Sequence, residues 1–200
     1  MSAAAAPRVS PTAALRAKRR ELTKRMRDAS GLEVIEAALR EPERLIAYEL
    51  IAFHREAMAL LDEPLLTRLA GALGSWADVD MFSVYLAGPA WRAGQITDAA
   101  IARWAKSPDR WWRRAALVAT VPLNMKSRGG TGDASRTLRV CGMLLDDRDD
   151  MVVKAMSWAL RELSKRDAGA VRAFLAVHDA RLAARVKREA RGKLETGRKP

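Results

Sequence analysis

The chain has 200 residues, of which 49% are apolar, and a formal net charge of +12 at pH 7. This length and apolar content suffice for one soluble domain with a sizeable core. No apolar run is long enough to cross a bilayer, so the composition excludes a membrane-spanning protein.

The N-terminal thirty residues are rich in alanine and in positive charge. They hold eight lysines and arginines against two acids, and Pro7 and Pro11 interrupt the alanine run. The stretch is too short and too polar for a signal peptide. We predict a basic N-terminal arm over residues 1–30, partly disordered or forming one helix, then a repeat domain over residues 31–194 and a basic tail over residues 195–200.

The excess positive charge belongs to the two ends of the chain. Residues 178–200 carry eight lysines and arginines against three acids, whereas residues 31–177 carry 20 against 19 and are close to neutral. Basic ends of this kind favour a polyanionic partner, most often nucleic acid. The alternative is that they are solvated faces that only keep the protein soluble.

Nearly every segment between prolines and glycines shows helical periodicity, and none shows the two-residue alternation of an amphipathic strand. We therefore predict an all-α protein. Ser75, Thr97 and the Pro108-Asp109 pair are suitable helix starts. The predicted helices are Thr12 to Asp28, Leu32 to Arg40, Glu43 to Leu61, Pro64 to Leu73, Trp76 to Ala87, Thr97 to Lys106, Asp109 to Val121, Ala134 to Leu145, Asp149 to Lys165, Ala168 to Val177 and Asp179 to Lys193.

Two of these segments repeat one another. The stretch that begins at Asp109 aligns with the stretch that begins at Asp149, which is an offset of 40 residues and places Arg114 opposite Lys154. This period is typical of helical-pair repeats of the HEAT type. We expect a right-handed α-α superhelix (solenoid) of about five such pairs.

A glycine-rich linker separates two predicted helices, from Asn124 to Asp133. Its main-chain amides could contact a phosphate backbone. A glycine-rich loop in a solenoid is more often only a turn, and we favour the turn.

Four side chains stand away from the apolar stripes of their helices. Trp76 and Asp80 lie one helical turn apart and off the stripe of Val79, Phe82 and Leu86. Further on, Trp158 shares a basic face with Lys154, Arg161 and Lys165, and Arg114 shares with Arg110 the side opposite the alanines of its helix. Packing does not require an aromatic ring, a carboxylate and cations on such faces, so we interpret them as a candidate site.

These segments carry a family resemblance. The motifs Ser75-Trp76-Ala77-Asp78-Val79-Asp80, Trp111-Trp112-Arg113-Arg114 and Lys154-Ala155-Met156-Ser157-Trp158 resemble the AlkD-like DNA alkylation repair enzymes, which are HEAT-repeat DNA glycosylases. The likeness covers roughly Leu65 to Leu194. It implies removal of cationic 3-methyladenine and 7-methylguanine from duplex DNA, with Asp80 as the catalytic carboxylate, Trp76 and Trp158 around the lesion, and Arg114 on the DNA backbone.

The chemistry of the residues is compatible with that activity. A purine alkylated at N3 or N7 is already cationic and leaves without a general acid, so one carboxylate can stabilise the developing sugar cation and orient water. Indole faces attract a cationic lesion, and arginine or lysine attracts phosphate. We include Lys154, Arg161 and Arg110 among the predicted DNA contacts.

Each residue also has a structural alternative. Asp80 could be a first-turn acid or the partner of a solenoid arginine. Arg114 and Lys154 could pair with acids such as Asp109 or Asp149, and the tryptophans could pack between helices, as we expect for Trp104, Trp111 and Trp112. A noncatalytic DNA-binding protein and a protein-interaction solenoid remain alternative functions.

Cysteine and histidine are too sparse for a metal centre. Cys141 is the only cysteine, and His54 and His178 are isolated. We expect no structural metal, no cofactor, no disulfide and a monomer in the reducing cytosol.

Overall fold

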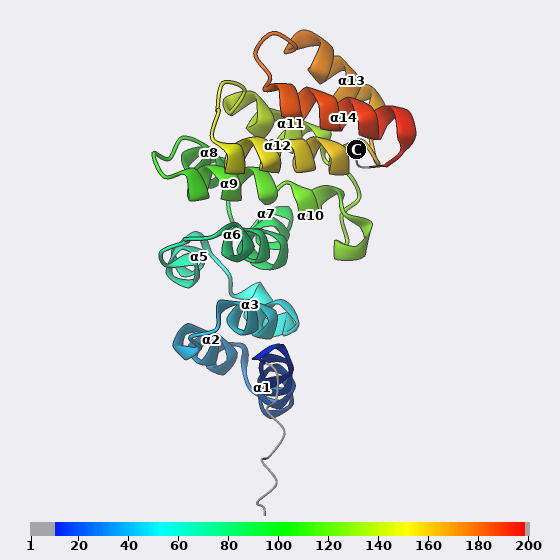
Figure 1. Ribbon diagram of the computed structural model, residues 1–200. Coiled ribbons are helices and arrows are strands. Elements are labelled where there is room, and N and C mark those ends of the chain that lie inside the picture. The colour runs from blue at the N-terminus through cyan, green and yellow to red at the C-terminus, as the bar shows by residue number, and fades with distance from the viewer. Residues whose placement is uncertain (1–10, 199–200) are drawn as a thin grey trace, which may run out of the picture. The chain divides into compact units, whose positions relative to one another are not determined.

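The computed structural model describes residues 11–198, and all regular structure in that range is helical, with no strand (Figure 1). The all-α prediction is confirmed, while the handedness of the superhelix stays a prediction. The helices form two compact units, Met1–Leu60 and Leu61–Pro200. Residues 1–10 of the predicted arm and 199–200 of the predicted tail lie outside the described residues. Within the described range no helix has the length and apolarity that a membrane span requires.

The first unit contains α1 (Pro11–Arg25), α2 (Gly31–Arg40), α3 (Arg44–Ala52) and α4 (Arg55–Ala59). A capping box between Ser30 and Glu33 starts α2 because it satisfies backbone donors at both positions. Within the predicted arm, α1 is helical and contains the buried Leu22. It contacts α3, to which an ion pair between Arg19 and Glu49 joins it. The boundary that we predicted at residue 30 lies inside this unit.

The predicted helix from Glu43 to Leu61 is wrong as a single element, because the chain breaks between α3 and α4. At the break His54 caps the start of α4: its Nδ1 accepts the N–H of Ala57 at 3.2 Å, and its Nε2 lies 3.1 Å from the carbonyl of Ala29. Because Nδ1 accepts a hydrogen bond, the proton of the neutral ring is on Nε2, which donates to the carbonyl of Ala29. The ring therefore acts as a helix cap and not as a metal ligand.

The second unit stacks its helices in two layers. In one layer α6, α9, α12 and α14 contact one another in that order, and in the other α8 and α11 lie against each other and against α9 and α12 (Figure 1). The elements of this unit are α5 (Glu63–Ala70), α6 (Trp76–Phe82), η1 (Ser83–Ala87), α7 (Gly88–Arg92), α8 (Asp98–Ala105), α9 (Arg110–Val118), α10 (Val121–Asn124), η2 (Lys126–Arg128), α11 (Ala134–Met143), α12 (Asp150–Leu163), α13 (Ala168–Val177) and α14 (Ala184–Thr196).

The repeat read from the sequence is visible in the way its two copies begin. Asp109 accepts the N–H of Trp111 at the start of α9, and Asp149 accepts the N–H of Met151 at the start of α12, both at 2.9 Å. Short polar side chains at this position satisfy the free donors of a first turn. Ser75 and Thr97 cap α6 and α8 in the same way, so the helix starts predicted at Ser75, Thr97 and Asp109 are confirmed. The helix predicted from Asp179 to Lys193 begins later, at Ala184.

Aromatic rings fill the space between the layers. Trp104 and Trp112 lie 5.0 Å apart between ring centroids, and Phe82 lies 6.0 and 6.2 Å from them. Tilted and edge-on pairs at such distances add to the apolar burial that holds repeats together. The prediction that these two tryptophans serve packing is confirmed, and Trp111 is half-buried with the guanidinium of Arg110 over its ring.

The helix that starts at Trp76 runs further than Ala87 because it passes through a π-helical turn. The N–H of Gly88 donates to the carbonyl of Ser83, five residues back. The wider turn allows the chain to continue through Pro89, which has no N–H to donate. Gly88 is also enclosed: a Cβ there would lie 2.2 Å from Pro122 Cγ and 2.5 Å from the carbonyl oxygen of Ala119.

The linker from Asn124 to Asp133 is a structured turn, as we favoured. The Asn124 side chain accepts the N–H of Asp133, and Arg166 donates to the carbonyls of Asn124 and Gly130. A Cβ at Gly130 would lie 2.4 Å from the carbonyl oxygen of Pro122. Only glycine allows the turn to lie this close to α10.

Substitution of Gly88 tests this packing. We expect Gly88→Ala to lower the free energy of unfolding by about 1–3 kcal/mol, because the added methyl group overlaps backbone atoms of another helix. Gly142 is the matched control: it lies inside α11 and has nothing within 4 Å of its Cβ position. Gly142→Ala should raise stability by about 0.5–1 kcal/mol through helix propensity. Urea unfolding followed by circular dichroism measures both free energies of unfolding. Changes of the same sign in the two variants would contradict the close packing assigned to Gly88.

Candidate nucleic-acid interface

Helix α6 places an exposed indole and a partly buried carboxylate one turn apart. Trp76 is the first residue of the helix and is 58% exposed, while Val79, Phe82 and Leu86 are fully buried. Asp80 follows one turn after Trp76, with 17% of its side chain exposed. The prediction that Trp76 and Asp80 stand off the core stripe is confirmed.

Arg114 of α9 binds Asp80 through both of its carboxylate oxygens. Nε lies 2.9 Å from Oδ1 and Nη2 lies 2.8 Å from Oδ2, which is the parallel, bidentate geometry that makes such pairs strong. The third donor, Nη1, reaches the carbonyl of Met151 on α12 at 2.5 Å. One guanidinium thus ties together three successive helices of one layer.

This geometry corrects our placement of Arg114. The helical wheel put it on the side of α9 away from the core, yet it is only 5% exposed. The wheel separates the apolar alanines from the polar residues, but it does not show that α6 and α12 cover the polar side as well. An acid from a neighbouring repeat does pair with Arg114, as the structural alternative expected, and that acid is Asp80 and not Asp109 or Asp149.

Burial raises the pKa of Asp80 above its ordinary value, and the hydrogen bonds and charge of Arg114 offset this only in part. The Asp80 carboxylate is therefore more basic than a solvated aspartate. The two bonds from Arg114 use one lone-pair direction on each oxygen, and a carboxylate offers about four. Asp80 can therefore still accept a hydrogen bond from water.

A groove of about 380 Å³ lies beside this ion pair, across α9, α12 and α14. Its walls come from consecutive helices of one layer, and all but two of its lining side chains are cations. The lining residues are Arg114, Lys154, Trp158, Arg161, Arg185 and Glu189. Trp158 thus lies on the basic face that the sequence predicted, together with Lys154 and Arg161.

Most of the charge in the groove is compensated. Asp150 pairs with Lys154 at 2.6 Å and with Arg185 at 3.0 Å. Glu189 accepts bonds from Arg185 and Ser157 and lies 3.7 Å from Arg161. Burial alone would raise the pKa of Glu189, but these donors and charges outweigh it and lower the pKa. The groove is a network of ion pairs with a small positive excess.

Two predicted contacts lie elsewhere. Among the described residues that line the groove, neither Trp76 nor Arg110 is present. Arg110 is half-exposed, lies 3.6 Å from Asp149 and covers the ring of Trp111. Their roles at a nucleic acid, like those of Asp80, Trp158, Lys154 and Arg161, stay predictions.

Sequence reasoning missed the two groove residues on α14, Arg185 and Glu189. They lie one turn apart and pair with each other at 2.9 Å. The sequence carries the signal of an i, i+4 ion pair at this place. We treated the segment only as part of a basic terminus, which hid its acid.

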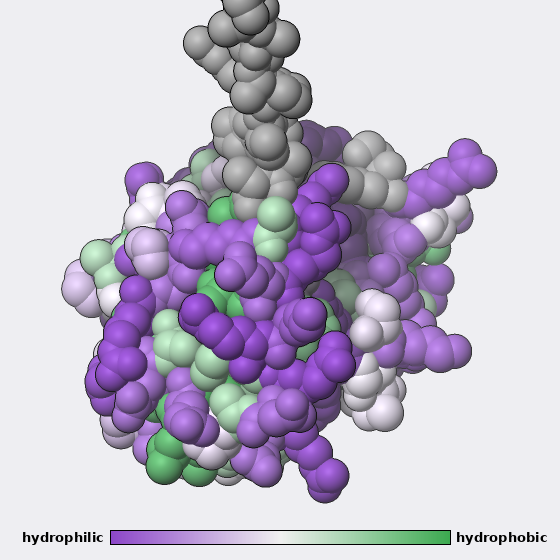
Figure 2. Space-filling view, turned by 90° about the horizontal axis from the view of Figure 1, so that it is seen from below, coloured by the Kyte–Doolittle hydropathy of each residue, from purple (hydrophilic) through white to green (hydrophobic). Residues whose placement is uncertain are grey.

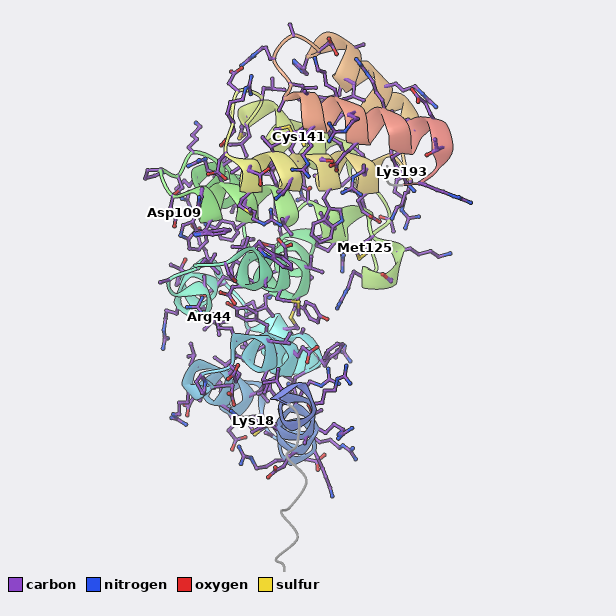
Figure 3. All side chains as sticks on the ribbon, viewed as in Figure 1. Lys18, Arg44, Asp109, Met125, Cys141 and Lys193 are labelled. Carbon is purple, nitrogen blue, oxygen red and sulfur yellow. The ribbon has the colours of Figure 1, made fainter. Side chains whose placement is uncertain are left out.

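No metal or thiol chemistry is built into the described residues, in which no three His, Cys, Asp or Glu side chains gather as metal ligands. Cys141 lies in the interior of the second unit (Figure 3). Complete burial raises the pKa of its thiol to about 12, so the thiolate is absent at neutral pH. Among the described residues, Asp80 does not itself line the groove and reaches it only through Arg114.

A sequence model of the family described as "DNA alkylation repair enzyme" matches residues 12–194. The chain belongs to this family. The match covers both units, and it makes this protein an enzyme of DNA repair with DNA as its partner. No individual curated protein matches the chain significantly in sequence. The net positive charge of the groove suits the DNA partner that family membership indicates, because DNA is a polyanion.

A double-mutant cycle measures the coupling of Asp80 and Arg114. We expect Asp80→Ala and Arg114→Ala each to destabilise the protein, and the double variant to lose about 1.5–3 kcal/mol less than their sum, because each single change leaves a buried charge unpaired. The exposed Arg110 and Asp149 pair is the matched control, with an expected coupling of about 0.5 kcal/mol or less. Chemical denaturation measures both coupling energies. Equal values for the two pairs would contradict a buried, mutually dependent pair of Asp80 and Arg114.

Proposed function

We propose that this protein is a DNA glycosylase that hydrolyses the N-glycosidic bond of cationic alkylated purines, such as 3-methyladenine and 7-methylguanine, in duplex DNA. The observation that carries the proposal is a partly buried carboxylate, Asp80, held in one orientation by Arg114 beside a cationic groove with an indole. No general acid is needed, because the alkylated base leaves as a neutral purine.

Asp80 has two tasks in this reaction. As the bond between C1′ and the purine nitrogen breaks, its electron pair goes to the base and the sugar becomes positively charged, so a fixed carboxylate stabilises the transition state. Water then adds to C1′ and gives up a proton, which the free lone pair of Asp80 can accept. The raised pKa of this buried carboxyl group favours the second task.

Arg114 orients Asp80 in this proposal and does not contact the DNA backbone, which revises the role that the family resemblance implied. All three of its donor nitrogens already have protein partners, and its side chain is 6% exposed. Lys154 and Arg185 are about 40% exposed and share the exposed acid Asp150. Such surface pairs are worth about 0–1 kcal/mol, so a DNA phosphate can replace the acid.

A base-release assay tests the activity. We expect the protein to release 7-methylguanine from methylated duplex DNA under single-turnover conditions, and Asp80→Asn to lower the rate by about 10²-fold or more while DNA binding is kept. Asp78→Asn, in the same helix turn, is the control that should keep the rate. Release no faster than spontaneous depurination by the intact protein would refute the proposal.

The roles of Arg114 and Lys154 can be separated by a matched pair of substitutions. Arg114→Gln should lower the single-turnover rate, leave the DNA dissociation constant nearly unchanged, and move the acid limb of the pH profile to higher pH. The ionised carboxylate is the active form, and loss of the guanidinium raises the pKa of Asp80 further. Lys154→Gln should weaken binding and reduce the salt slope by about 0.9. If Arg114→Gln weakened DNA binding and Lys154→Gln lowered the rate, Arg114 would be the phosphate contact.

One observation favours a second candidate, a noncatalytic DNA-binding protein. Both oxygens of Asp80 are engaged by Arg114, which weakens its field at a sugar. The same assay decides, because this candidate predicts salt-dependent binding without base release. A protein-interaction groove is disfavoured, since the lining holds four cations and a single aromatic ring.

A further inference from the structure

A second groove, outside the candidate site, lies in the first unit between α1 and the end of α3. Its volume is about 350 Å³, within the usual range for small-ligand sites. Cations dominate its lining, with an aromatic ring at the end of α3. The lining residues are Arg19, Arg20, Thr23, Lys24, Arg27, Glu49 and Phe53.

The charges of this groove differ from those of the groove on α12. Glu49, its one acid, is already neutralised by Arg19 at 3.1 Å. Arg20, Lys24 and Arg27 are exposed, and none of them has an ion pair with another described residue. Three cations with no protein acid to balance them attract a polyanion more strongly than a compensated network. Figure 2 shows a surface on which hydrophilic side chains gather around small apolar areas.

Phe53 adds an aromatic surface beside these cations. It caps the end of α3 and is 68% exposed. Exposure of a large ring costs solvation free energy, and a phenyl ring flanked by cations is the arrangement on which unpaired bases stack. In a duplex the bases cover one another, so a ring on a protein surface reaches only a base that has left the stack.

The geometry points to a site for unpaired nucleic acid: the groove binds a single DNA strand, with a base on Phe53 and neighbouring phosphates on Arg20, Lys24 and Arg27. The hydroxyl of Thr23 lies in the same lining and can donate to phosphate. This site lies within the first unit and does not depend on base excision, since its ligand is a strand and not a lesion.

Fluorescence anisotropy of the full chain with a labelled oligothymidylate tests the site. The triple variant Arg20→Gln, Lys24→Gln, Arg27→Gln should lower affinity and reduce the salt slope by about 2, at about 0.7 for each lost contact. Arg68→Gln, Lys106→Gln, Arg172→Gln is the control, because it removes the same residue types and charge from exposed positions of the second unit. An equal loss in both triple variants would overturn the proposal.

The aromatic contact has its own variant. Phe53→Leu keeps an apolar side chain but removes the ring, and should lower affinity for the oligothymidylate by about tenfold, while affinity for a duplex of equal length changes little. Leu32→Ala, at an exposed apolar residue of α2, is the control. Unchanged binding by Phe53→Leu, an equal loss for duplex, or equal competition by anionic phospholipid vesicles would each overturn the assignment. Circular dichroism checks that each variant is folded.

Discussion

The ion pair between Arg114 and Asp80 is the contact on which the second unit depends. It joins α6 to α9, and the third donor of the guanidinium carries the connection to α12. A buried charge without its partner costs several kcal/mol, so the two residues hold each other in place. The same contact holds Asp80 in one orientation and partly shields it from water, and the proposed glycosylase reaction would use a carboxylate placed in this way.

Similar pairs recur along the stack. Arg103 of α8 binds Glu63, Arg113 of α9 binds Asp147, and Arg136 and Arg139 of α11 both bind Asp98. Each pair joins residues from 34 to 41 positions apart, which is about one repeat. The repeats therefore use their acids against the cations of their neighbours, and this explains why the central part of the chain is nearly neutral although it is rich in charge.

The two grooves show two different uses of positive charge. Beside Asp80 the cations are paired with acids, so in the proposed complex a DNA phosphate would replace a protein carboxylate at small net cost. In the first unit Arg20, Lys24 and Arg27 have no acid partner among the described residues, and the groove combines their positive charge with the exposed ring of Phe53. Under the two proposals, the groove of the first unit attracts the polyanion and the groove beside Asp80 holds one sugar in register.

The sequence by itself determined the helical class, the helix starts at Ser75, Thr97 and Asp109, the 40-residue repeat and the off-core positions of Trp76, Asp80 and Trp158, because these follow from periodicity and capping within single segments. Only the tertiary structure decided that Arg114 is buried and bound to Asp80, that His54 caps a separate helix α4, and that Arg185 and Glu189 join the groove. A helical wheel shows which face is polar, but the neighbours that cover this face come from other repeats and lie far away in sequence. Packing between repeats therefore fixes the partners of each charge, and the partners fix its role.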